Sequence, residues 1–210
     1  MTTSTTPRRV VVIQAGLGQP SSTRLLGDRL AEATRDALLE RGVESQVEVV
    51  ELRDHAQALA STLLTGFATG DLRAALDSVA AADAVIAVTP VYQGSFSGLF
   101  KTFVDVLDDG SLRGTPVLLA ATAGTARHSL VLEHAMRPVF TYLKAVTVPT
   151  AVFAASEDWG SSGTVDGGLA RRVQVAAGEL ADLVSGQGRH RERPDEFADP
   201  VPFEELLRGS

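Results

Sequence analysis

Five short apolar segments, each followed by a stretch with helical periodicity, constrain the fold of this chain more than any other feature. The first, residues 10–15 (VVVIQA), is β-branched and almost continuously apolar, a pattern typical of a strand buried on both faces of a parallel sheet. The predicted strands are residues 10–15, 46–52, 84–88, 115–121 and 147–154. The predicted helices are residues 23–41, 71–81, 97–107, 128–143 and 168–184.

This alternation predicts an α/β fold with three layers. Parallel strands joined by right-handed crossovers place their helices on both faces of the sheet. The 210 residues, 44% of them hydrophobic, suffice for one well-buried domain and not for two of ordinary size. We assign residues 9–185 to that domain, residues 1–8 to a disordered lead-in and residues 186–210 to a polar tail. Residues 53–70 interrupt the alternation and are expected to form a short helix or packed loop.

The composition excludes several classes of function. Asp and Glu number 26 against 19 Lys and Arg, so the net charge of −7 disfavours non-specific binding to nucleic acid. The sequence has no cysteine, which excludes disulfides, thiolate metal sites, iron–sulfur clusters and cysteine nucleophiles. No apolar stretch approaches the roughly 20 residues that span a bilayer. We therefore expect a cytoplasmic protein without a membrane or nucleic-acid partner.

In an open parallel sheet the ligand binds beyond the carboxyl ends of the strands, where the strand order reverses. The loop after the first strand contains small residues and then hydroxyl residues at the start of a helix. Such a loop offers free amides, a positive dipole end and hydroxyl donors to a phosphate. The alternative is that the hydroxyls only cap the helix. The candidate binding residues here are Gly16, Gln19, Ser21, Ser22 and Thr23.

The loops after the third and fourth strands predict a slot for a flat ring. Pro90 and Gly94 favour a tight turn, and Tyr92 and Gln93 offer a ring face and hydrogen bonds. The fourth loop places small residues beside one guanidinium and one imidazole. The candidate residues of the slot are Pro90, Val91, Tyr92, Gln93, Gly94, Ser95, Thr122, Ala123, Gly124, Thr125, Arg127 and His128.

Other chemistries fit the sequence less well. The first loop matches neither the Walker A motif nor the dinucleotide fingerprint, which disfavours nucleoside triphosphate chemistry. The segment 94–98 (GSFSG) has the wrong spacing for a nucleophile elbow, which disfavours hydrolysis. The acidic cluster of Asp105, Asp108 and Asp109 is better explained as solvated surface than as a metal site. We predict neither a metal ligand nor a catalytic side chain.

Three of these motifs carry a resemblance to a known family. The segments 20–23 (PSST), 90–105 (PVYQGSFSGLFKTFVD) and 122–130 (TAGTARHSL) resemble the NADPH-dependent FMN reductases of the flavodoxin-like superfamily. The likeness covers roughly residues 8–185 and is strongest to the actinobacterial-type reductases that partner luciferase-like monooxygenases. It implies a flavodoxin-like three-layer sandwich with a five-stranded parallel sheet of order 2-1-3-4-5.

The resemblance also implies cofactors and roles. FMN and NAD(P)H are the implied cofactors, and hydride transfer between them needs no protein acid or base. Ser21, Ser22 and Thr23 would hold the FMN phosphate, residues 90–95 would follow the ribityl chain and ring edge, and residues 122–127 would contact the isoalloxazine. Many family members have Ser and Arg where this chain has Leu17, Gly18 and Gln19. The loop therefore lacks a charged phosphate clamp. Arg24 and Arg127 are the candidates for the 2′-phosphate of NADPH.

Several alternatives remain open from the sequence. An FMN-bound quinone or azo reductase would share the same site, and a flavodoxin-like electron carrier or a flavin-free module would share the fold. NADH and NADPH are not distinguished. We also expect a homodimer, or a tetramer built on it, with a flavin-dependent monooxygenase as a further partner. The expected dimer contacts are the helices that begin near Ser97 and His128, because their apolar residues lie on more than one face: Phe96, Phe100, Phe103, Val104, Met136, Val139, Phe140 and Leu143.

Overall fold

A computed structural model describes residues 6–159 and 168–186 of the chain. Arg8, which was assigned to the lead-in, already belongs to the first strand. Residues 1–5 of the predicted lead-in lie outside the described residues, and so does the predicted tail apart from Gly186.

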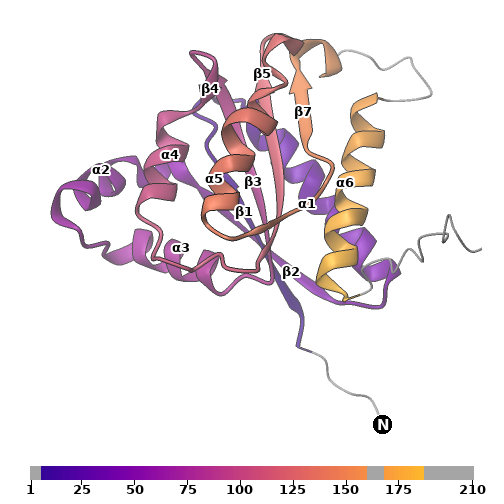
Figure 1. Cartoon of the computed structure of the whole chain (residues 1–210), viewed down its shortest axis with the longest axis horizontal. Coiled ribbons are helices and arrows are strands. Elements are labelled where there is room, and N and C mark those ends of the chain that lie inside the picture. Colours follow the sequence, from indigo (N-terminus) through magenta and orange to yellow (C-terminus); the bar gives the residue numbers. More distant parts are fainter. Residues whose placement is uncertain (1–5, 160–167, 187–210) are drawn as a thin grey trace, which may run out of the picture.

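The described residues form an α/β fold around one parallel sheet (Figure 1). The strands are β1 (Arg8–Gln14), β2 (Ser45–Glu51), β3 (Ala84–Tyr92), β4 (Ser95–Phe96), β5 (Pro116–Ala123), β6 (Val146–Thr147) and β7 (Val152–Ala155). Their order is β2-β1-β3-β5-β6, with β7 also paired to β5 and β4 paired to β3. All pairs except β3–β4 are parallel. The predicted parallel arrangement is confirmed.

The predicted number of five strands is wrong, because the described sheet has seven. The expected fifth strand, residues 147–154, is divided into β6 and β7. Between the pairs Val117–Thr147 and Ala120–Val152, this segment advances five residues while β5 advances three. Pro149 lies in the interruption and has no N–H for the ladder. The seventh strand, β4, folds back on the end of β3 as a short antiparallel hairpin.

Helices cover both faces of the sheet. The α-helices are α1 (Ser22–Glu40), α2 (Ala56–Thr65), α3 (Gly70–Ala80), α4 (Gly98–Asp105), α5 (Arg137–Tyr142) and α6 (Gly168–Val184). The single-turn elements are η1 (Leu52–His55), η2 (Ala126–His128), η3 (Leu132–Met136) and η4 (Ser156–Trp159). The predicted insertion thus contains η1 and α2. The helix predicted over residues 128–143 is confirmed over residues 131–142. Its middle turn, η3, is π-helical ahead of Pro138, which lacks the N–H that an unbroken α-helix needs, and η2 stands at its predicted start.

The sheet separates two hydrophobic cores. Along β1, Val11 and Ile13 face the core beneath α3, α4 and α5, whereas Val10 and Val12 face the core beneath α1 and α6. Both faces of the strand are therefore buried, which explains its continuous apolar sequence.

The apolar residues of the expected dimer helices mostly belong to the subunit's own core. Phe100, Phe103, Val104, Met136 and Phe140 are buried in the core beneath α3, α4 and α5. The remaining three are partly buried and pack against the same core: Phe96, Val139 and Leu143. These side chains do not provide the surplus apolar face on which the dimer expectation was based.

Arg137 joins η3 and α5 to the connection between β6 and β7. Its guanidinium donates to Thr147 Oγ1 at 2.9 Å and to the carbonyl oxygens of Val148 and Pro149 at 3.0 and 3.2 Å. It also donates to both carboxylate oxygens of Glu133. These hydrogen bonds from Arg137 lower the pKa of Glu133 below its ordinary value.

Replacing Arg137 by Met should lower the free energy of unfolding by about 1–3 kcal/mol, because it leaves partly buried acceptors without a donor. Urea denaturation measures this, with the exposed Arg113→Met as the control. Glu133 has its lower pKa in the folded state, so its contribution is present above the unfolded carboxyl pKa of about 4.3 and is lost as the pH falls. The difference between wild type and Arg137→Met should therefore shrink in acid. Equal destabilisation by both Met variants would contradict this role.

Candidate functional site

The three predicted binding loops meet at the carboxyl edge of neighbouring strands. From β1 the chain proceeds to β2 on one side, whereas from β3 it proceeds to β5 on the other, so the strand order reverses between β1 and β3. The hydroxyls of Thr23 and Thr122 are 2.8 Å apart and buried, which links the first loop to the end of β5. Pro90 is the register partner of Thr122. The structure therefore brings together the beginnings of all three loops.

The first loop is packed tightly against the start of α1. Gly16 is buried, and a Cβ atom placed on it would lie 2.2 Å from Ser21 Oγ and 3.1 Å from Thr23 Cβ. Ser21 is the N-cap residue, and its hydroxyl accepts a hydrogen bond from the Arg24 amide at 3.2 Å. The preceding amides of α1, those of Ser22 and Thr23, have no acceptor within the helix. They are positioned at the positive end of a 19-residue helix, where an anion is stabilised.

A polar network that was not predicted from the sequence holds this loop at the end of β1. The buried Gln14 side chain accepts from the Gly16 amide at 3.0 Å and donates to Glu51 at 2.5 Å. Glu51 also pairs with Arg24, and Arg24 donates to Asp28 at 2.8 Å. Arg24 is thus engaged by two carboxylates, which argues against its expected role at a ligand phosphate. Gln14 at the end of a buried apolar run was the available sequence signal.

The third loop is a two-residue hairpin between β3 and β4. Tyr92 pairs with Ser95 across it, and the two loop residues, Gln93 and Gly94, have φ values of 50° and 81°. Two consecutive positive φ values are the pattern of a type I′ turn, which favours glycine. The predicted tight turn is confirmed. Gly94 is exposed, and no heavy atom lies within 4 Å of a Cβ placed on it.

The fourth loop leaves β5 and enters η2. Thr122 is buried at the end of the strand, whereas Gly124 and Thr125 are exposed. Arg127 and His128 are also exposed and lie in η2. Open space lies beside Gly124, as it does beside Gly94.

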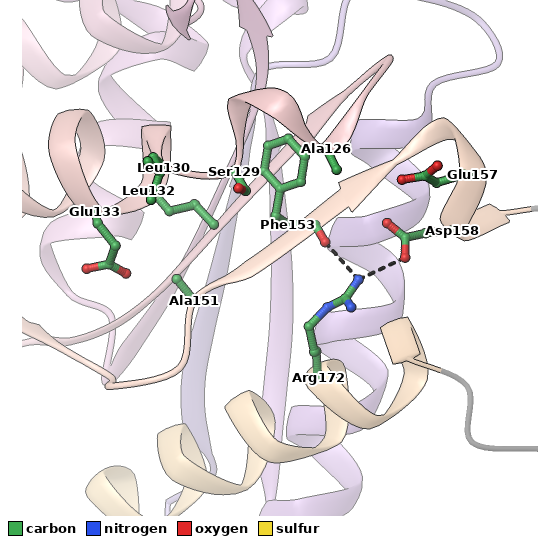
Figure 2. A pocket seen from close by; sticks show the side chains of 10 residues that line it. All are labelled: Ala126, Ser129, Leu130, Leu132, Glu133, Ala151, Phe153, Glu157, Asp158 and Arg172. Carbon is green, nitrogen blue, oxygen red and sulfur yellow. Dashed lines mark hydrogen bonds and ion pairs between the residues drawn. The ribbon is translucent and has the colours of Figure 1, made fainter.

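A cavity of about 430 Å³ lies on the β7 side of the fourth loop (Figure 2). Arg172 of α6 lies at its wall and donates to the carbonyl of Phe153 at 3.1 Å and to Asp158 at 2.9 Å. The lining residues are Ala126, Ser129, Leu130, Leu132, Glu133, Ala151, Phe153, Glu157, Asp158 and Arg172. Of the residues 122–127 that the resemblance places against the isoalloxazine, only Ala126 is among them. The cavity therefore borders the predicted slot at Ala126 and extends from there toward β7 and α6.

The acidic cluster at the end of α4 is involved in ion pairs. Asp105 accepts from Lys101 at 2.5 Å, and Asp108 accepts from Arg73 at 3.0 Å. Within the part of the chain that the structure describes, no cluster of three or more metal-binding side chains occurs.

Comparisons with known proteins place the chain in a family. A family model described as NADPH-dependent FMN reductase matches residues 8–160. The chain belongs to the NADPH-dependent FMN reductase family. It is 39% identical to an FMN reductase (NADPH) from Pseudomonas aeruginosa, over 87% of this chain and 96% of that protein. It is 36% identical to the NADH-dependent FMN reductase SfnF from Pseudomonas fluorescens, over 84% of this chain and 92% of that protein.

Solved structures support the fold of this reductase-family chain. An oxidoreductase from Corynebacterium diphtheriae is 43% identical and superimposes with a TM-score of 0.82, over 87% of this chain and 99% of that one. A flavodoxin, WrbA-like protein from Agrobacterium tumefaciens is 16% identical, with a TM-score of 0.59 over 88% of this chain and all of that one. The predicted flavodoxin-like fold is confirmed. In residues 6–159 and 168–186, no helix has the length and apolar character to cross a membrane.

Replacing Gly16 by Ala should lower the free energy of unfolding by about 1–3 kcal/mol, since the added methyl group overlaps Ser21 Oγ. Gly124→Ala is the matched control, because no atom lies within 4 Å of its Cβ position. Urea denaturation of both variants measures the difference. If Gly16→Ala were as stable as Gly124→Ala, the loop would not be packed as described.

Proposed function

We propose that this chain is an NAD(P)H:FMN oxidoreductase that transfers hydride from a reduced nicotinamide to FMN. The proposal rests on one observation. The start of α1, which can stabilise an anion, lies at the same edge of the sheet as the loops at Gly94 and Gly124, which have open space beside them. Family membership agrees with it, and the named relatives include one NADPH-dependent and one NADH-dependent reductase. We therefore propose that either NADH or NADPH is the reductant, and the two are compared in the test below.

The residues present fit FMN. Its phosphate would lie on the amides of Ser22 and Thr23 and the hydroxyls of Ser21 and Ser22. The open space beside Gly94 and Gly124 would admit its flat ring. When bound, the flavin ring itself supplies the hydride chemistry, so no side chain has to act as acid or base.

The chain's contribution is to position the ring and leave one ring face accessible. Pro90, Val91 and the hairpin from Tyr92 to Ser95 would follow one edge of the slot. The exposed Tyr92 ring offers an aromatic surface there. Thr122, Ala123, Gly124 and Thr125 would follow the opposite edge, with Arg127 and His128 beyond them. Gln19 would lie on the phosphate side of the first loop.

The test is the oxidation of NADH and NADPH by the purified chain with FMN, riboflavin or a quinone as acceptor. FMN-dependent oxidation without any partner reductase is expected, because the site accommodates both the phosphate and the ring. An electron carrier would oxidise neither nicotinamide on its own. Oxidation that needs a quinone and leaves added FMN unreduced would favour a quinone reductase instead.

We also propose that the chain forms a homodimer next to this site and supplies reduced flavin to a flavin-dependent monooxygenase. Support for the dimer comes from Leu130 and Tyr142, which are 62% and 86% exposed near η3 and α5. Association would remove these apolar surfaces from water. The monooxygenase is supported by the sequence motifs alone. A monomer mass in light scattering at micromolar concentration, with full activity, would contradict the dimer.

Replacing both Ser21 and Ser22 by Ala should weaken FMN binding by about 1–3 kcal/mol, because hydrogen bonds to a charged phosphate are lost. Riboflavin has no phosphate, so its affinity should be unchanged. Thr23 is left intact because its hydroxyl bonds to Thr122 in the interior. Flavin fluorescence titration measures both affinities, with the exposed Ser61→Ala as the control. If the affinities for FMN and riboflavin fell equally, the phosphate would not bind in this loop.

Replacing Gly94 by Val should abolish flavin-dependent NAD(P)H oxidation, since a β-branched residue resists a φ of 81° and would distort the hairpin. Gly94→Asn is the matched variant, because Asn tolerates this conformation, and it should retain more activity. Thermal denaturation should show that both remain folded. Normal flavin affinity and turnover in Gly94→Val would show that the slot lies elsewhere.

A further inference from the structure

We propose that Arg53, in the turn after β2, supplies the positive charge for the FMN phosphate that the first loop itself lacks. This inference rests on the function proposed above. Residues 15–23 contain no Lys or Arg, so the loop offers only amides and hydroxyls to a dianionic group. Arg53 is distant from this loop in the sequence but adjacent to it in the fold.

The fold directs Arg53 toward the first loop. β2 lies next to β1 in the same direction, so η1 begins beside the end of β1. Leu52 is fully buried and anchors η1 at that edge of the sheet. Arg53 thereby reaches Gln19, whose side-chain amide lies 2.9 and 3.0 Å from the two terminal guanidinium nitrogens. Both nitrogens can only donate, so the amide oxygen must face them.

The charge of Arg53 is poorly neutralised in this position. Its one carboxylate neighbour among the described residues is Asp54, 3.3 Å from Nε and 66% exposed, and such a surface pair contributes little. Arg24 differs, because Glu51 and Asp28 both engage it. The two terminal nitrogens of Arg53 are therefore bonded to a neutral amide alone. A phosphate is a stronger acceptor that fits the planar fork, and it would replace or share the Gln19 oxygen.

The sheet order favours the FMN phosphate over the 2′-phosphate of NADPH as the partner of Arg53. β2 lies on the side of β1 opposite to β3 and β5, whose loops form the proposed ring slot. A nicotinamide that stacks on the ring would approach from the slot. Arg53 therefore lies on the side of the first loop that faces away from the nicotinamide.

The experiment compares Arg53→Gln and Arg53→Lys with the matched control Arg35→Gln, which removes an exposed arginine from α1. FMN and riboflavin affinities are measured by flavin fluorescence at low and moderate salt. Arg53→Gln should weaken FMN binding by about tenfold or more, because it removes a charge-assisted hydrogen bond. Riboflavin affinity should not change, and the salt dependence of FMN binding should decrease. Arg53→Lys should recover part of the loss, and Arg35→Gln should match wild type.

Three results would overturn this assignment. FMN affinity could be unchanged in Arg53→Gln, or FMN and riboflavin affinities could fall equally, which would indicate a structural role. A higher KM for NADPH alone, with FMN affinity intact, would assign Arg53 to the nicotinamide instead. Should Arg53→Gln fail to fold by circular dichroism, Arg53→Met, which keeps the aliphatic part of the side chain without its charge, would replace it, and an FMN affinity equal to wild type at both salt concentrations would decide against the proposal. These results differ from a failure of the proposed reductase function. In that case the wild-type protein would neither prefer FMN to riboflavin nor oxidise NAD(P)H.

Discussion

The reversal of strand order between β1 and β3 determines where this chain can bind a ligand. Because the connections from these two strands diverge, their carboxyl ends leave space that neither loop fills. The Thr23–Thr122 hydrogen bond holds the loops of β1 and β5 at a set separation across that space. The helix start, the hairpin at Gly94 and the loop at Gly124 all depend on this arrangement for their proximity.

The chain has a net charge of −7, yet the local charges at the candidate site favour a phosphate ligand. Backbone amides at the start of α1 carry a partial positive charge that the side-chain count does not include. The two nearby arginines differ in availability, since Arg24 is bound by Glu51 and Asp28 and Arg53 faces a neutral amide. Gln14 connects this network to the loop by accepting from the Gly16 amide. The shape of the loop and its charge therefore depend on side chains from β1, β2 and α1 together.

Much of the fold could be predicted because burial on both faces leaves a clear pattern in β1, β3 and β5. The split of the last strand could not, since it depends on where Pro149 falls against the register of β5. The hairpin strand β4 has two residues, too few to show alternation. The apolar residues of α4 and α5 suggested a subunit interface, but most of them pack in the core, where the rings of Phe100 and Phe140 lie 6.3 Å apart. Helical periodicity does not say how many neighbours a helix has.

The meeting of the three candidate loops at one edge of the sheet was predictable, because the switch-point rule needs only the order of strands and the residues that follow them. Gln14 and Glu51 were missed, because their roles arise from contacts between β1, β2 and α1 that no local motif displays. The contact of Arg53 in η1 with Gln19 was missed for the same reason, since the two residues are far apart in the sequence. These polar residues become a signal only after β1 and β2 are placed side by side.

A structure of the chain in complex with FMN would show whether the flavin binds where the strand order reverses. We expect the phosphate over the first amides of α1, and the isoalloxazine between the Gly94 hairpin and the loop at Gly124. A flavin ring seated instead in the cavity between Leu130 and Arg172, with its phosphate away from Ser21 and Ser22, would contradict this expectation.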